Sequence, residues 1–149
     1  MAKKTQISIL NGFWLLLFAY SCMLMAEITW RYHSLALDVN FLMIKQTEVE
    51  GLWWYKYVFY IHVCTAILAL PAGFTQFNSG LLKRHPRLHR TIGYVYIVSI
   101  LGFAAPSGAL IGAVANGGLF AIISFELLAL GWSYFTWQGV RLALQKKIN

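Results

Sequence analysis

Four long apolar stretches constrain this chain more than any other feature of its sequence. They cover residues 7–28, 52–74, 91–114 and 118–142. Each holds about 22 to 25 residues, which at about 1.5 Å per residue lets a helix cross a hydrocarbon core of about 30 Å. Only 11% of the 149 residues are charged, so little of the chain remains for a soluble domain. We therefore predict an all-α integral membrane protein, an antiparallel four-helix bundle that forms one domain over 1–149.

The first apolar stretch is expected to be an uncleaved membrane span. The basic segment Met1–Lys4 precedes it, as in a secretory signal peptide. However, the apolar run is longer than the hydrophobic region of a signal peptide and lacks a small-residue cleavage site. A run of this length is typical of a membrane-spanning helix.

Basic residues are distributed unevenly between the two ends of such a bundle. If the helices alternate in direction, nine of the 12 fall on one side, namely Lys3, Lys4, Lys83, Arg84, Arg87, Arg90, Arg141, Lys146 and Lys147. Three of the five acids, Asp38, Glu48 and Glu50, lie in the loop on the other side. Because basic residues remain cytoplasmic, we predict that both termini and the 75–90 loop are cytoplasmic. The net charge of +7 then indicates contact with anionic lipids at that face, and no nucleic-acid partner is expected.

Two predicted spans carry an ionisable side chain near their middle. His62 begins a small and polar face of the second span that continues through Ala69, Gly73 and Gln76, and Glu126 lies on a similar face of the fourth. Both lie roughly 12–15 Å from the outer ends of their helices, so contact between them is possible. An ionisable group at this depth needs a partner inside the bundle. We predict a His62–Glu126 pair, which serves as a proton relay, as support for a metal or haem, or as a hydrogen bond that fixes helix packing.

A second group of candidate residues lies at the start of the third span. Pro86 suits the first turn of a helix, and His85 and His89 then lie four residues apart on one face. Such a pair can begin a zinc, copper or haem site, or it can belong to a basic cluster that meets lipid phosphates. His89 is the stronger candidate because it lies one turn deeper, and Gly93 and Tyr96 continue its face.

The segment from Phe59 to Phe103 resembles a known family. It contains FYIHVCTAILALPAGFTQF followed by LLKRHPRLHRTIGYVYIVSILGF, and it is similar to the bacterial membrane proteins of domain of unknown function 2306. The motif residues here are His62, Gly73, Gln76, His89, Arg90, Gly93 and Tyr96. The resemblance implies a multi-pass protein of the bacterial cytoplasmic (inner) membrane and assigns no reaction. Glu126 lies outside the resembling segment.

Three functions remain open from the sequence. In a redox-associated protein, His62 and His89 would coordinate haem b or a transition metal, with His85 as a further metal ligand. Around such a cofactor Gln76 and Tyr96 would contribute polar groups, and Arg90 would bind a propionate, a quinone oxygen or a lipid phosphate. The predicted cofactor site thus comprises His62, His89, Gln76, Arg90 and Tyr96. In an accessory or assembly subunit, the polar faces would pack within a larger membrane complex or a homo-oligomer. In a small proton-coupled transporter or carrier, the His62–Glu126 pair would move the proton.

The depths of the two histidines limit the haem hypothesis. His62 is roughly 18 Å above the inner end of its helix and His89 is about 6 Å inside its own. A shared site therefore requires that Pro71 shorten this difference, or the two histidines serve different sites. The sequence holds no HExxH, P-loop or GxGxxG motif, so it gives no support to metalloprotease, nucleotide-binding or soluble dehydrogenase functions.

The predicted topology can be tested by labelling single cysteines introduced near residue 40 and near residue 80, with Cys22 and Cys64 replaced. A membrane-impermeant thiol reagent applied to intact cells should label the first site and not the second, because basic loops remain inside. Labelling of the second site from outside would contradict the topology.

Overall fold

The chain folds into four membrane-length helices joined by short helical segments. The computed structural model describes residues 2–145, with side chains from Gly12 onward. In this part of the chain the long helices are α1 (Ala2–Trp30), α4 (Tyr55–Gln76) and α8 (Gly118–Gln145), and the third span combines α6 (Pro86–Ile97), η1 (Val98–Ala104) and α7 (Ala105–Gly112). All four are long and apolar enough to cross a membrane, so the protein is a multi-pass membrane protein. The predicted all-α class with four spans is confirmed.

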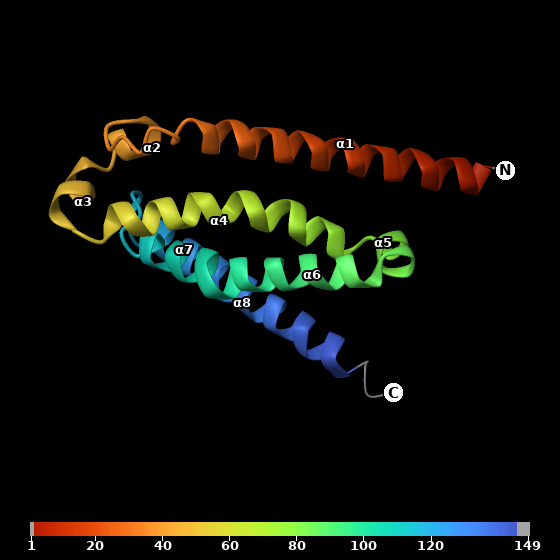
Figure 1. Ribbon diagram of the computed structural model, residues 1–149. Coiled ribbons are helices and arrows are strands. Elements are labelled where there is room, and N and C mark those ends of the chain that lie inside the picture. The colour runs from red at the N-terminus through yellow and green to blue at the C-terminus, as the bar shows by residue number, and fades with distance from the viewer. Residues whose placement is uncertain (1, 146–149) are drawn as a thin grey trace.

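Consecutive spans run in opposite directions along the molecule (Figure 1). The start of α1, the short helix α5 (Ser79–Arg84) and the end of α8 lie near one end. The other end holds α2 (Asn40–Met43), α3 (Gln46–Gly51) and the turn between α7 and α8. Arg84, Arg87 and Arg90 therefore lie at the same end as the start of α1 and the end of α8. Lys146 and Lys147 lie outside the described residues, as do the side chains of Lys3 and Lys4.

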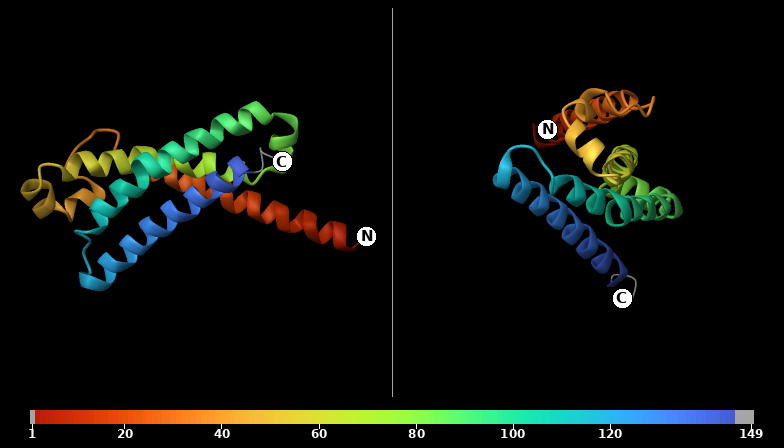
Figure 2. Two further views of the ribbon diagram at one scale, coloured as in Figure 1. Left: turned by 90° about the horizontal axis from the view of Figure 1, so that it is seen from below. Right: turned by 90° about the vertical axis from the view of Figure 1, so that its left-hand side faces the viewer.

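The third span separates the outer helices of this bundle. α4 packs against α1 on one side and against α6, η1 and α7 on the other, whereas α8 packs against α7 and η1. Figure 2 shows the resulting open arrangement, in which α1 and α8 lie on opposite sides of α4 and the third span. α1 and α8 thus present much of their apolar surface to lipid, as expected of a protein whose solvent is a bilayer.

Local sequence signals explain where these helices begin and end. Pro86 occupies the first turn of α6, where a missing N–H leaves no intrahelical bond unmade. The side chain of Asn78 accepts a hydrogen bond from the backbone N–H of Leu81 at 2.9 Å and caps α5, a helix that the sequence analysis did not predict. Gly117 and Gly118 have φ values of 108° and 71°, which permit the tight turn from α7 into α8.

The third span is interrupted by a π-helix rather than by a simple proline kink. η1 covers seven residues, and the N–H of Ala105 bonds to the carbonyl of Ile100, five residues earlier. Pro106 follows in the first turn of α7, where it has the least effect on helical hydrogen bonds. The wider π turn changes the direction of the carbonyls and side chains that follow it, and such turns are frequent at functional sites.

A buried lysine fastens the loop between α1 and α4 to the turn between α7 and α8. Lys45 is fully buried. Its ammonium donates to the Glu48 carboxylate at 2.7 Å, to the Asn116 side-chain oxygen at 2.8 Å and to the carbonyl of Val114. These three bonds use all three ammonium protons, and one of them satisfies a carbonyl just beyond the C-terminus of α7. The hydrogen bond from Lys45 also holds the pKa of Glu48 below its ordinary value.

Replacing Lys45 by Met should lower the free energy of unfolding by about 3 kcal/mol, because removing one partner of a buried charge network leaves the others unpaired. Thermal unfolding in detergent micelles measures the change. Lys56→Met is the matched control, since the Nζ atom of Lys56 lies 5.0 Å from the ring centroid of Tyr57 and makes no hydrogen bond or ion pair among the described residues.

The stabilities of wild type and Lys45→Met should also respond differently to pH. Because folding lowers the pKa of Glu48, the Lys45–Glu48 bond stabilises the protein above the ordinary pKa of the carboxyl and ceases to do so as the pH falls through the lowered value. The difference between wild type and Lys45→Met should therefore shrink in acid. Equal stability of the two proteins at neutral pH would contradict a structural role for Lys45.

Candidate functional site

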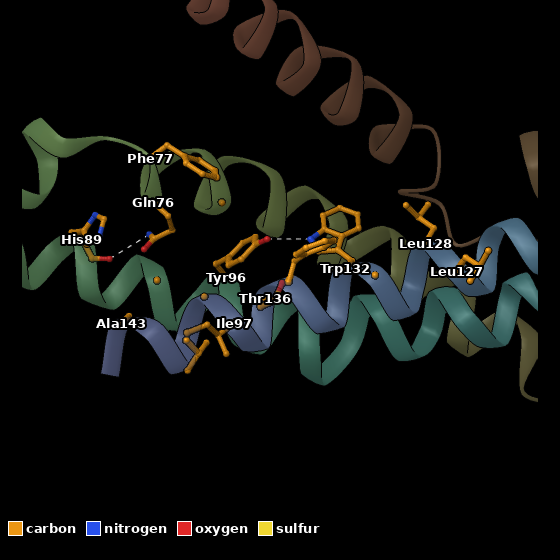
Figure 3. A pocket seen from close by; sticks show the side chains of 16 residues that line it. Gln76, Phe77, His89, Tyr96, Ile97, Leu127, Leu128, Trp132, Thr136 and Ala143 are labelled. Atoms are coloured by element: carbon orange, nitrogen blue, oxygen red, sulfur yellow. Dashed lines mark hydrogen bonds between the residues drawn. The ribbon is translucent and has the colours of Figure 1, made fainter. Parts of the chain in front are cut away.

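A cavity of about 750 Å³ lies between α4, α6 and α8, toward the end of the bundle that holds α5. We call it the His89 cavity, and its polar and small lining residues are Gly73, Gln76, His89, Gly93, Tyr96, Gly131, Trp132, Thr136, Gly139 and Ala143. Apolar side chains such as Leu127, Leu128 and Ile97 complete its wall (Figure 3). The volume is typical of sites for small organic ligands. Five of the seven motif residues named in the sequence analysis therefore line one space.

Hydrogen bonds across this cavity orient three of its polar groups. The Trp132 indole N–H donates to the Tyr96 hydroxyl oxygen at 3.1 Å, which joins α8 to α6. The Gln76 side-chain amide donates to the carbonyl of His89 at 3.4 Å, which joins α4 to α6 (Figure 3). Because the Tyr96 oxygen accepts from Trp132, its own proton remains available to another acceptor.

Two of the residues that line the His89 cavity carry a buried polar atom without a partner among the described residues. Thr136 is 6% exposed, and its hydroxyl oxygen is buried without a hydrogen bond. The Nδ1 atom of His89 is also buried and unpaired. Among the described side chains only Thr29 and Tyr55 carry a comparable atom, and neither lines this cavity. Buried polar groups normally find a partner, so two exceptions among the lining residues make this cavity the candidate functional site.

Glycines of the motif allow α4 and α6 to approach closely beside the cavity. A Cβ atom on Gly73 would lie 2.7 Å from Cε2 of Tyr96, and one on Gly93 would lie 2.8 Å from Oε1 of Gln76. Both distances are too short for atoms that are not bonded. The glycines of the motif therefore position Tyr96 and Gln76, two of the side chains that reach the cavity.

A second cavity of about 500 Å³ lies nearer the opposite end of the bundle. We call it the His62 cavity. Its lining includes Lys45, His62, Ala69, Gly108, Asn116 and Trp132. Trp132 and Leu128 line both cavities and so lie between them. The Nδ1 atom of His62 contacts the carbonyl of Ala104 at 3.0 Å and the hydroxyl of Ser107 at 3.1 Å.

The direct His62–Glu126 pair predicted from the sequence is not formed. The structure shows no ion pair or hydrogen bond between these side chains, and His62 finds its partners on the third span instead. The physical reason is the packing order, since α7 and η1 lie against both α4 and α8. The Glu126 carboxylate lies beside Gly112 of α7, where a Cβ atom would be 3.4 Å from its Oε1. The carrier hypothesis therefore loses the direct proton relay on which it rested.

The other predicted site residues divide between the two cavities and the surface. His62 and His89 line different cavities, as one of the two alternatives from the sequence requires. His85 and Arg90 are exposed and line neither cavity. In the described part of the chain no group of three or more His, Cys, Asp or Glu side chains is arranged to hold a metal ion. The structure therefore does not bring His62, His89 and His85 together, and metal binding by these histidines at separate sites stays a prediction.

Sequence reasoning missed Trp132 and the role of Lys45. Trp132 belongs to a face of α8 that recurs every three or four residues, through Leu128, Thr136 and Gly139. This period is present in the sequence, but the functional face of this span was predicted around Glu126, on a neighbouring face of the helix. Lys45 gave no comparable signal, because nothing in a loop sequence distinguishes a buried lysine from an exposed one.

Residues 59–149 match the model of a family described as "Predicted membrane protein (DUF2306)". The chain belongs to this family. The match extends beyond the segment identified from sequence motifs and includes all of α8, so Glu126, Trp132 and Thr136 lie within it. No curated protein and no solved structure matches the chain.

The close approach at Gly73 can be tested with Gly73→Ala. The added methyl group would collide with the Tyr96 ring, so the ring must move and lose its bond to Trp132, or the helices must separate. We expect a loss of about 1–3 kcal/mol in the free energy of unfolding, typical of overpacking. Gly131→Ala is the control, because a Cβ atom there would meet nothing within 4 Å. Equal effects of the two changes in thermal unfolding would contradict this account.

Proposed function

We propose that this protein is a redox-associated component of the bacterial cytoplasmic membrane that binds a lipid-soluble quinone in the His89 cavity. The observation that carries the proposal is that Tyr96 and Thr136, two residues that line this largely apolar cavity, each have a hydroxyl proton without an acceptor in the described part of the protein. Binding within the membrane requires no soluble domain. Both termini would lie in the cytoplasm, which places this cavity in the inner half of the bilayer.

Thr136 is an unusual hydroxyl residue for a helix in this protein. Ser124 and Ser133 of the same helix donate to the carbonyl four residues earlier, at 2.7 Å and 2.9 Å. Thr136 makes no such bond, although it is more deeply buried than either. Its hydroxyl proton therefore has no acceptor among the described residues. Together with the free proton of Tyr96, it supplies two donors from helices on different sides of the cavity.

A quinone suits these groups because its carbonyl oxygens accept hydrogen bonds and its ring is flat and apolar. Trp132, Tyr96 and Phe135 offer aromatic surfaces for the ring. An isoprenoid tail would extend among Leu127, Leu128 and the lipid. A hydrogen bond from a hydroxyl group to the quinone contributes more binding free energy in an apolar cavity than in water. In the cavity a donor without an acceptor raises the free energy, whereas in water it would bond to solvent.

Haem b fits the same residues less well. His62 lies in the other cavity, so two histidines do not face one iron, and His89 remains as the single nitrogen ligand. Arg90, the residue expected to bind a propionate, does not line the cavity. A quinone thus pairs with more of the polar groups that line the cavity than haem b would. The exposed faces of α1 and α8 remain available for packing against a larger complex.

Equilibrium binding of a short-tailed benzoquinone to the purified protein in detergent micelles tests the proposal. Thr136→Val and Tyr96→Phe should each weaken binding about three- to tenfold, the effect of losing one hydrogen bond. Ser133→Ala and His85→Ala are matched controls that should bind as wild type does, because neither side chain lines the cavity.

Two outcomes would overturn the quinone proposal. One is binding that is unaffected by both hydroxyl substitutions. The other is a Soret absorbance band in the purified protein that is lost in His89→Ala and kept in His85→Ala, which would assign the cavity to haem b.

A further inference from the structure

The His62 cavity differs in chemical character from the His89 cavity. Small residues of α4 and the third span create its space, among them Ala66, Ala69, Ala104 and Gly108. At its other end Lys45 is bound to Glu48, Asn116 and the carbonyl of Val114, so its ammonium has no proton left for a ligand. The His62 imidazole is therefore the polar group that a ligand can use in the deep part of this cavity.

The protonation of the His62 ring follows from its partners. The carbonyl of Ala104 can only accept, so the Nδ1 atom at 3.0 Å must carry a proton. The Ser107 hydroxyl donates to the carbonyl of Phe103 at 2.6 Å, which leaves its oxygen to accept from Nδ1 as well. In the neutral ring the other nitrogen, Nε2, then bears an unshared electron pair. Nε2 has no hydrogen-bond partner among the described residues.

The third span is built to hold the ring in this state. η1 ends at Ala104, whose carbonyl meets His62 of α4. Gly108 follows one turn later, where a Cβ atom would lie 3.1 Å from Cε1 of the ring. A larger residue there would push the imidazole away from its partners. The π turn and Gly108 thus fix one nitrogen as a donor to the backbone and leave the other free.

We propose that the His62 cavity is a second, separate ligand site that takes an apolar molecule bearing a hydroxyl donor, of the phenol or hydroquinone class, with Nε2 of His62 as the acceptor. The proposal is independent of quinone binding in the His89 cavity. The two cavities present opposite polarity, because Tyr96 and Thr136 offer protons and His62 offers an electron pair. Trp132 forms a wall of both.

The binding of 4-propylphenol to the purified protein tests this site. Its methyl ether, 4-propylanisole, has almost the same apolar body and no hydroxyl proton, so it is the matched control ligand. We expect the phenol to bind about five- to tenfold more tightly than the ether. Equal affinities for the two ligands would overturn the proposal.

His62→Asn separates the ligand contact from the structural role of the ring. The Asn amide can donate to the carbonyl of Ala104 as Nδ1 does, but it has no atom at the position of Nε2. This variant should stay folded and lose the preference for the phenol. His33→Asn is the control, because Nδ1 of His33 also contacts a backbone carbonyl, that of Trp30 at 2.8 Å, outside the cavity.

Two further measurements keep the proposal falsifiable if His62→Asn does not fold. Nitrogen NMR of histidine-labelled protein should show Nε2 of His62 unprotonated, and its resonance should move when the phenol is added. A protonated Nε2 would overturn the proposal. Thr136→Val and Tyr96→Phe should leave phenol binding unchanged, and a loss of phenol binding in both would place that ligand in the His89 cavity instead.

Discussion

A bilayer core offers no water to satisfy polar groups, and the structure depends on this constraint throughout. Most hydroxyl side chains in the spans find a hydrogen-bond partner within their own helix, as Ser21 and Ser124 do by donating to the carbonyl four residues earlier. His62 finds its hydrogen-bond partner on another helix, at the carbonyl of Ala104 in the third span. Thr136 finds no hydrogen-bond partner among the described residues. In such a solvent an unsatisfied hydroxyl is a stronger indication of a ligand than it would be on a soluble protein, because water cannot serve as its partner.

Spacing between helices determines where those polar groups meet. Gly73 and Gly93 let α4 and α6 touch, so that Tyr96 and Gln76 are held against glycine backbones. α8 is fixed at its start, where Gly112 of α7 lies against the Phe125 side chain, and its later part borders a cavity. Close packing on one side of Tyr96 and open space on the other orient its hydroxyl toward α8. The glycines of the motif therefore serve the site by placing side chains rather than by contacting a ligand.

The sequence predicted the helices well and the contacts between them less well. Length and apolar composition were enough for all four spans, and Pro86 marked the start of α6 correctly. The predicted partner of Glu126, His62, was wrong. Helical spacing and depth define the face of a helix and the position of a residue across the membrane, but not the order in which the helices pack. The π-helix adds a second source of error, since its wider turns shift the face of every residue after Val98 relative to a regular α-helix. Neither the packing order nor the π-helix can be deduced from hydrophobic periodicity alone.

The two cavities differ in how much of their lining lies within the family match. All the residues that line the His89 cavity lie between Gly73 and Ala143, inside the matched range of 59–149. The His62 cavity is walled partly by Met25, Phe41 and Lys45, which precede that range. The floor of the His62 cavity is thus built by the part of the chain that matches the family, and its cover comes from α1 and the loop that Lys45 fastens. A chain with the same α4 to α8 and a different segment before it would keep the His89 cavity intact. It would also keep the His62 imidazole on its carbonyl partner, but the cavity around Nε2 would be reshaped.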